Sequence, residues 1–175
     1  MLFFKMFKPT TKRIATSVAF ASILVGCTSI QPLYRAAGTN SNVASELRAI
    51  KIEPIPERLG HYLGNELIFA LNGTGSAGPY KYRLVLNVRE RVQTPLIDTV
   101  NGRATAATVM SDVDYKLYPI NGGDAIISGT VFAIATYDRT SQRFANLRAA
   151  RNAEIRDAKS NAEQIRTQIA DKFIK

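Results

Sequence analysis

The side chains that could do chemistry in this 175-residue chain are few, since it has one cysteine and one histidine. His61 could act as a general base only with a serine and an acid beside it. It falls inside a helical pattern, and no sequence nearby marks an activated nucleophile. Asp112 and Asp114 form the closest carboxylate pair, but strand alternation places both on one face, where solvation is usual. We therefore expect no enzyme and no metal site.

A glycine-rich stretch, Gly73-Thr74-Gly75-Ser76-Ala77-Gly78, formally matches the GxGxxG pattern of dinucleotide-binding proteins. That chemistry needs a strand, a tight turn and then a helix N-terminus, whose amides and dipole meet the pyrophosphate. Here the glycines follow a predicted helix and precede a predicted strand. The order is inverted, so we interpret the stretch as a loop and expect no cofactor.

The N-terminus has the layout of a secretory signal peptide. Residues 1–13 carry four basic residues and no acid, and residues 14–26 carry no charge at all. A cationic start, a short apolar run and small residues at its end are typical of export signals. These thirteen uncharged residues fall short of the roughly 20 that a membrane-spanning helix needs. A buried core helix is the alternative.

Cys27 closes the sequence Leu24-Val25-Gly26-Cys27, which resembles a bacterial lipobox. The resemblance implies acylation of the Cys27 thiol, cleavage before it, and acylation of the new amino group. Each buried CH₂ of an acyl chain contributes about 0.8 kcal/mol, so two or more chains anchor stably. Thr28 follows the cysteine, and the absence of aspartate there favours the outer over the inner membrane. An ordinary buried thiol is the alternative.

Cleavage before Cys27 would divide the chain into three parts. Residues 1–26 would be the lipoprotein signal peptide, residues 27–45 a lipidated tether of irregular composition, and residues 46–175 a single domain without a disulfide. The mature part keeps 19 basic against 14 acidic residues, a net charge of +5. An exported lipoprotein does not meet nucleic acid, so we expect any anionic ligand to be a lipid or glycolipid.

Hydrophobic periodicity predicts four strands and two helices. Alternation predicts strands over 47–55, 80–92, 104–118 and 125–137, and a three-to-four residue period predicts helices over 57–71 and from Phe144 to Phe173. The second helix has an apolar stripe of Ile155, Ala158, Ala162, Ile165, Ile169 and Phe173. The order β-α-β-β-β-α predicts an α+β fold, a two-layer sandwich with two helices packed on a four-stranded, mostly antiparallel sheet.

Four arginines are expected at one end of this sheet. In an up-down-up meander, the turn after the second strand and the exit from the fourth strand lie at the same end. That end would gather Arg103, Arg139, Arg143 and Arg148. Arginine binds phosphate through two parallel hydrogen bonds. The pattern indicates an anionic glycolipid headgroup or an acidic partner surface, with a solvated rim as the alternative. Lys81, Arg83 and Arg89 add charge on a sheet face.

Several motifs together resemble the LPS-assembly lipoprotein family, the LptE-like proteins, in their alphaproteobacterial branch. The motifs are SIQPLYR after the lipobox, NELIFALNG, GRATAATVM and the long segment TYDRTSQRFANLRAARNAEIRDAKSNAEQIRTQIA. The likeness covers nearly all of the mature chain. Its motifs are not catalytic, and their joint order carries the resemblance.

The resemblance implies an acyl-anchored protein on the periplasmic side of the outer membrane. Such proteins plug the LPS-assembly β-barrel protein, help it fold, and aid delivery of lipopolysaccharide (LPS) to the outer leaflet. The family fold is the same two-layer sandwich. Family members bind LPS through basic residues after strands two and four, and the nearest matches here are Arg103 and Arg139 or Arg143. An auxiliary lipoprotein of a lipid-transport ABC system is the alternative function.

Overall fold

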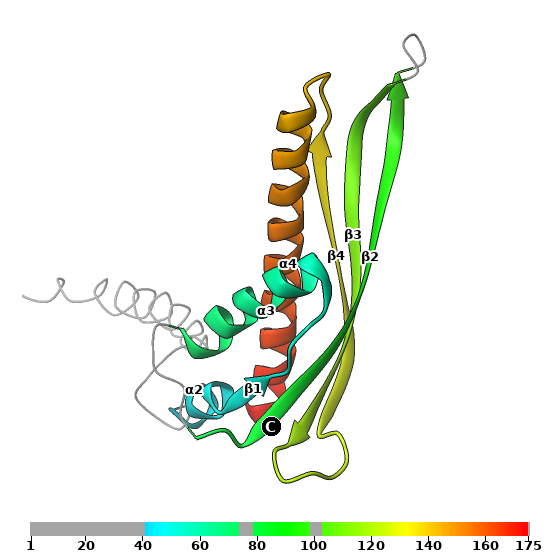
Figure 1. The fold of residues 1–175 in the computed structure, drawn as a ribbon. Helices are drawn as coiled ribbons and strands as arrows, with labels where there is room; N and C mark the ends of the chain where they lie inside the picture. The colour runs from blue at the N-terminus through cyan, green and yellow to red at the C-terminus, as the bar shows by residue number, and fades with distance from the viewer. Residues whose placement is uncertain (1–40, 74–78, 99–102, 175) are drawn as a thin grey trace, which may run out of the picture. The chain divides into compact units, whose positions relative to one another are not determined.

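The computed structural model describes residues 41–73, 79–98 and 103–174, all within the unit Ala36–Lys175. The predicted signal segment and Cys27 lie outside the described residues. The elements are α2 (Ser41–Arg48), β1 (Ile50–Ile52), α3 (Glu57–Asn72), β2 (Tyr82–Asp98), β3 (Arg103–Pro119), β4 (Ile127–Asp138) and α4 (Arg143–Ile174), as Figure 1 shows. No helix in these ranges combines the length and the apolar composition that a membrane crossing requires.

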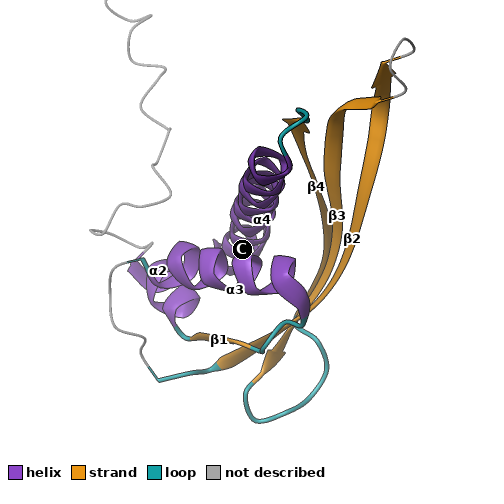
Figure 2. Cartoon of the chain, turned by 45° about the horizontal axis from the view of Figure 1, so that its top comes forward, coloured by secondary structure: helices purple, strands orange, loops and turns teal. Residues whose placement is uncertain are grey.

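The four strands form one sheet in the order β1-β2-β3-β4. β1 pairs in parallel with β2, where Ile50 lies opposite Tyr82, while β2 with β3 and β3 with β4 are antiparallel. A parallel pair needs a crossover connection, and α3 is part of it. The helices cover one face of the sheet (Figure 2). The predicted α+β class and mostly antiparallel sheet are confirmed.

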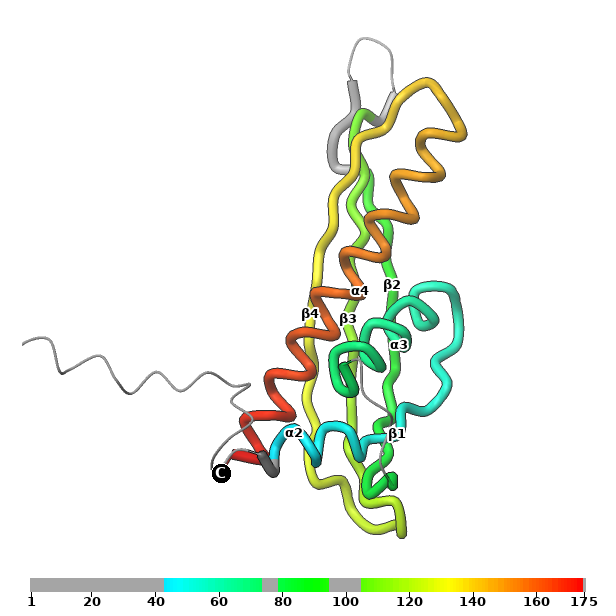
Figure 3. The backbone as a smooth tube through the Cα atoms, turned by 90° about the vertical axis from the view of Figure 1, so that its left-hand side faces the viewer, coloured from blue at the N-terminus to red at the C-terminus, as the bar shows by residue number. Residues whose placement is uncertain are grey.

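The core lies between the helices and the covered sheet face. α4 packs on β4 and β3, and α3 packs beside α4 (Figure 3). Alternate residues of the long strands are buried, as a half-covered sheet requires. Leu59, Leu63 and Leu67 of α3 are buried against them, which confirms the predicted face of this helix.

Helix α2 was not predicted from the sequence. It begins inside the segment expected to be a tether, so residues 41–45 are part of the folded domain. Val43 and Leu47 are spaced four apart, so they share one helix face, and both lie in the core. Because the helix runs to Arg48, β1 is only three residues long, shorter than the predicted strand over 47–55.

Helix α4 also differs from its predicted stripe. Ala158, Ala162, Ile165 and Ile169 are buried as expected, but Ile155 is 39% exposed. Three polar residues take the buried positions in the neighbouring turns: Glu154, Asp157 and Asn161. They are tolerated inside because each finds a polar partner on another element.

Two side chains of α4 also reach the edge strand of the sheet. The Arg156 guanidinium donates a hydrogen bond of 2.8 Å to the Thr136 carbonyl, and the Gln164 amide donates one of 3.1 Å to the Phe132 carbonyl. Both carbonyls belong to β4, which has a strand partner on one side only. Unpaired backbone groups on an edge strand are a template for further strands, and α4 occupies two of them.

Candidate functional site

The four predicted arginines lie at one end of the sheet. Arg103 is the first residue of β3, and its backbone pairs with Asp98 of β2. Arg139 follows β4 directly and donates its backbone N–H to the Thr105 carbonyl at 2.9 Å. Helix α4 starts at Arg143 at this same end (Figure 1). We call this region, with Arg103, Arg139, Arg143 and Arg148, the arginine end.

A network of hydrogen bonds fixes the connection between β4 and α4. The Asn146 carboxamide accepts a bond of 2.7 Å from the Thr140 backbone N–H and donates one of 2.8 Å to the Thr140 carbonyl. The Thr140 hydroxyl accepts a bond of 3.2 Å from the Gln142 backbone. Local side-chain bonds of this kind hold a turn without help from secondary structure. The backbone that carries Arg139 and Arg143 is therefore pre-organised.

The described side chains of the arginine end are free to meet a ligand. Arg139, Arg143 and Arg148 are exposed, and within the described ranges none of them takes part in an ion pair. The first turn of α4 also contains no acid, although acids are favoured at a helix N-terminus. The result is local positive charge without an internal counter-charge. The Arg103 side chain lies outside the described residues.

The other predicted basic region is neutralised internally. On the uncovered sheet face, Arg89 pairs with Asp114 at 3.0 Å and Arg91 with Asp112 at 2.6 Å. The expected solvated carboxylates are therefore partners of β2 arginines. Exposed pairs of this kind add at most about 1 kcal/mol of stability, but they remove net charge from the face.

Two further basic residues of that region are also engaged. Lys81 pairs with Glu46 at 2.6 Å, and the Arg83 guanidinium lies 4.9 Å from the Tyr118 ring centroid. A hollow of about 550 Å³ opens nearby. Two charged residues line it. Asp114 is bound by Arg89 and Thr130, so Lys116 is the charged residue of the hollow that could meet an anion. The uncovered face is thus a weaker anion site than the arginine end.

The structure places the one histidine of the chain on α3. His61 is exposed, and the side-chain amide nitrogen of Asn65 lies 3.3 Å from its Nε2. Among the described residues no group of three or more histidine, cysteine or carboxylate side chains could hold a metal ion. Gly73 ends α3 with a positive φ of 60°; the remaining glycine-rich residues, 74–78, lie outside the described part.

A buried polar cluster between β3 and α4 was missed by the sequence analysis. The Ser111 hydroxyl donates a hydrogen bond to Asp157, and the Asn161 amide donates to Ser111 at 2.6 Å and to Asp157 at 3.3 Å. We call these three residues the polar seam. Burial raises the pKa of the Asp157 carboxyl, and the bond from Ser111 partly offsets that rise. The i, i+4 spacing of Asp157 and Asn161 was the available signal.

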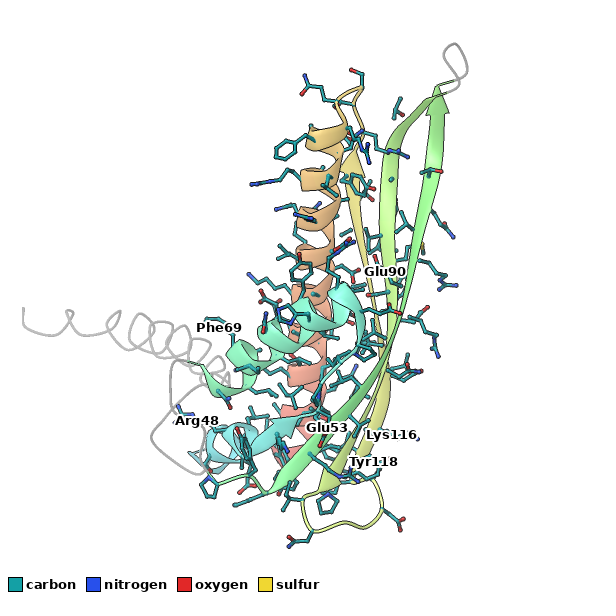
Figure 4. The ribbon with its side chains drawn as sticks, viewed as in Figure 1. Arg48, Glu53, Phe69, Glu90, Lys116 and Tyr118 are labelled. Atoms are coloured by element: carbon teal, nitrogen blue, oxygen red, sulfur yellow. The ribbon has the colours of Figure 1, made fainter. Side chains whose placement is uncertain are left out.

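An ion pair lies beside the polar seam. The Arg58 guanidinium of α3 binds the Glu154 carboxylate through two bonds of 2.5 and 2.6 Å. Glu154 is only 3% exposed, so Arg58 balances a buried charge. Glu90 of β2 lies on the side of the sheet that faces the helices (Figure 4). Burial raises the pKa of Glu90, and the charge of Glu154 raises it further. The Arg58–Glu154 pair fastens α3 to α4.

The fold is shared with bacterial lipoproteins of known structure. A candidate lipoprotein from Caulobacter crescentus CB15 has a TM-score of 0.62 at 25% sequence identity, over 75% of this chain and 95% of that one. A minor lipoprotein from Acinetobacter baumannii has a TM-score of 0.55 at 19% identity, over 70% and 90%. Rare lipoprotein B from Shewanella oneidensis has a TM-score of 0.52 at 12% sequence identity, over 71% of this chain and 96% of that one. No family model and no curated protein matches the chain.

Proposed function

We propose that this chain is a lipoprotein of the outer membrane, held on the periplasmic side by acyl chains on Cys27. It forms a plug-and-barrel complex with the LPS-assembly β-barrel protein, helps that protein fold, and aids insertion of LPS into the outer leaflet. Its role is binding and assembly, without catalysis or a cofactor. The lipoprotein fold, the LVGC sequence and the resemblance to LPS-assembly lipoproteins support this proposal together.

The observation that carries the proposal is the arginine end. Three exposed arginines without an internal ion pair lie on a pre-organised connection. Arginine matches phosphate geometry, and exposed charge of one sign steers anionic ligands towards it. LPS is a phosphorylated, acylated glycolipid, so it supplies the anion that this end lacks.

The first experiment purifies the tagged full-length protein from membranes in mild detergent and identifies what remains bound. We expect a large outer-membrane β-barrel protein in near-equal amount. Recovery without a barrel, or with subunits of an inner-membrane transporter, would overturn the assembly role and favour the ABC-system alternative.

The variant His61→Ala should keep its partner and its function, because we assign no catalytic role to the histidine.

A second experiment tests the anion site. Reversing two charges, with Arg103→Glu and Arg143→Glu, should weaken LPS binding and outer-membrane integrity. A matched control reverses Arg48 and Lys51, which are also exposed; Arg48 lies on α2, away from the arginine end (Figure 4). Unchanged LPS binding and unchanged membrane integrity in the first variant would exclude this site.

The anchor is tested separately. The variant Cys27→Ser removes the only thiol in the chain. We expect it to carry no acyl mass and to keep residues 1–26, because cleavage before residue 27 depends on the acylated cysteine. Intact acylation in this variant would contradict the assignment of Cys27.

A further inference from the structure

Five residues in the first half of α4 form a continuous exposed strip, which we call the α4 stripe. They are Phe144, Leu147, Arg148, Arg151 and Ile155. Steps of three and four residues bring side chains to one helix face. The three apolar members are 72%, 45% and 39% exposed. The opposite side of the same turns packs inward and includes Ala153, which is fully buried.

The fold separates the charges of this part of α4. Between residues 143 and 156 the only acid is Glu154, and it points inward to the Arg58 guanidinium. The stripe itself therefore carries arginine without acid, although the helix as a whole has charges of both signs. Arg148 and Arg151 take part in no ion pair within the described ranges.

The combination of side chains selects the kind of ligand. Apolar and cationic side chains lie within one helical turn of each other, as Leu147 and Arg148 do, so the ligand must present acyl chains and anionic groups close together. Arginine suits a phosphate, and exposed aliphatic and aromatic side chains gain by covering an acyl chain. The stripe is continuous with the arginine end, since Arg143 directly precedes Phe144. A soluble anion would use the arginines alone.

We propose that the α4 stripe binds the acylated, phosphorylated part of LPS, with acyl chains on its apolar residues and phosphate on Arg148 and Arg151. The inference rests on the proposed function and extends it. The arginine end alone would bind a headgroup, whereas the stripe adds contact with the lipid part and runs along the helix. The polar seam and the ion pair of Glu154 hold this face of α4 outward.

Photo-crosslinking in cells tests the contact. Phe144 is replaced by benzoylphenylalanine in the full-length protein, which changes an exposed aromatic ring only slightly. The matched control is Phe69, 65% exposed on α3 and on the side away from the sheet (Figure 4). We expect an LPS adduct at Phe144 and none at Phe69. An adduct with phospholipid or protein only, or no adduct, at Phe144 would overturn the inference.

An affinity measurement completes the test. The double variant Leu147→Ser with Ile155→Ser keeps every arginine, and we expect it to bind LPS about tenfold more weakly. The control, Ile68→Ser with Phe69→Ser, removes two apolar side chains of α3 that are even more exposed, at 50% and 65%, and should bind as the parent does. Equal affinity of the two variants would overturn the inference. Co-purification of the barrel, followed in the same membranes, reports separately on the proposed function.

Discussion

Ser111 donates a hydrogen bond to Asp157 across the interface between β3 and α4. Both residues are fully buried, and Asp157 keeps one carboxylate oxygen without a hydrogen-bond partner among the described residues. A buried carboxylate with few donors is more stable when protonated. We therefore expect the stability of this helix–sheet contact to depend on pH.

Asp157 should make the domain less stable as pH rises. Its folded pKa is raised, so its favourable contribution is complete below the unfolded pKa near 3.8 and is lost as pH rises through the folded pKa. For one titrating group, the free energy of unfolding cannot change by more than about 1.4 kcal/mol per pH unit. Asp157→Asn keeps an acceptor for the Ser111 hydroxyl but cannot ionise, so the stability of this variant should decrease less as pH rises. The measurement is urea unfolding at several pH values between acid and neutral.

Glu90 has to be separated from Asp157 in that experiment, because its raised pKa gives the same sign. The variant Glu90→Gln serves this purpose, and the double variant should have the flattest pH profile. If the profile of Asp157→Asn runs parallel to that of the parent, Asp157 does not titrate in this range.

The Arg58–Glu154 pair should contribute more than the exposed pairs of the sheet. Arg58→Met leaves the carboxylate of Glu154 buried without its partner, and we expect a loss of about 1–3 kcal/mol in the free energy of unfolding. Arg91→Met breaks a pair whose acid is 26% exposed, so it should cost less than about 1 kcal/mol. Urea unfolding at pH 7 measures both variants. Equal losses of unfolding free energy would show that the buried pair contributes no more than the exposed one.

Gly129 should not tolerate a side chain. A Cβ there would lie 2.7 Å from the Tyr115 hydroxyl oxygen and 2.8 Å from its Cζ. The Tyr115 ring is buried, and its hydroxyl donates to Gln168 of α4. Gly129→Ala must displace the ring, and we expect a loss of about 1–3 kcal/mol. Thermal unfolding checks the value, and adding Tyr115→Leu should recover part of it. A neutral Gly129→Ala would show that the ring moves freely.

Ligand affinity should distinguish paired from unpaired arginines. Arg139→Gln with Arg143→Gln removes two charges that lack an ion pair, so LPS binding should weaken, and more so at low salt. Arg89→Gln with Arg91→Gln removes the same charge from residues already held by Asp114 and Asp112. We expect its binding to change little. Comparable losses in both variants would mean that net charge alone governs affinity.

Much of this fold follows from sequence periodicity. The long strands alternate clearly, and the leucines of α3 repeat every four residues, so both kinds of element were predicted. The end of β2 was not, because the strand continues past the predicted Val92 to Asp98. The meander in turn predicted which chain segments meet at the arginine end. Contact between Arg139 and Thr105 is the direct outcome of that topology.

The remaining features depend on partners that are distant in sequence. Helix α2 is short and rich in polar residues, and its burial comes from Val43 and Leu47 docking on the core. Likewise Asp157 and Asn161 are buried where they meet Ser111 of β3. Periodicity places apolar residues inside, so it cannot foresee a polar group that is satisfied by another element.

The side chains that occupy β4 carbonyls have a consequence for biogenesis. Arg156 and Gln164 belong to α4, which follows β1 to β4 in the chain, so the strands are synthesised before these two side chains. Until α4 docks, β4 presents its backbone to any other extended segment, including a second nascent copy. A chain that stops before Arg143 would keep every strand and lose this protection.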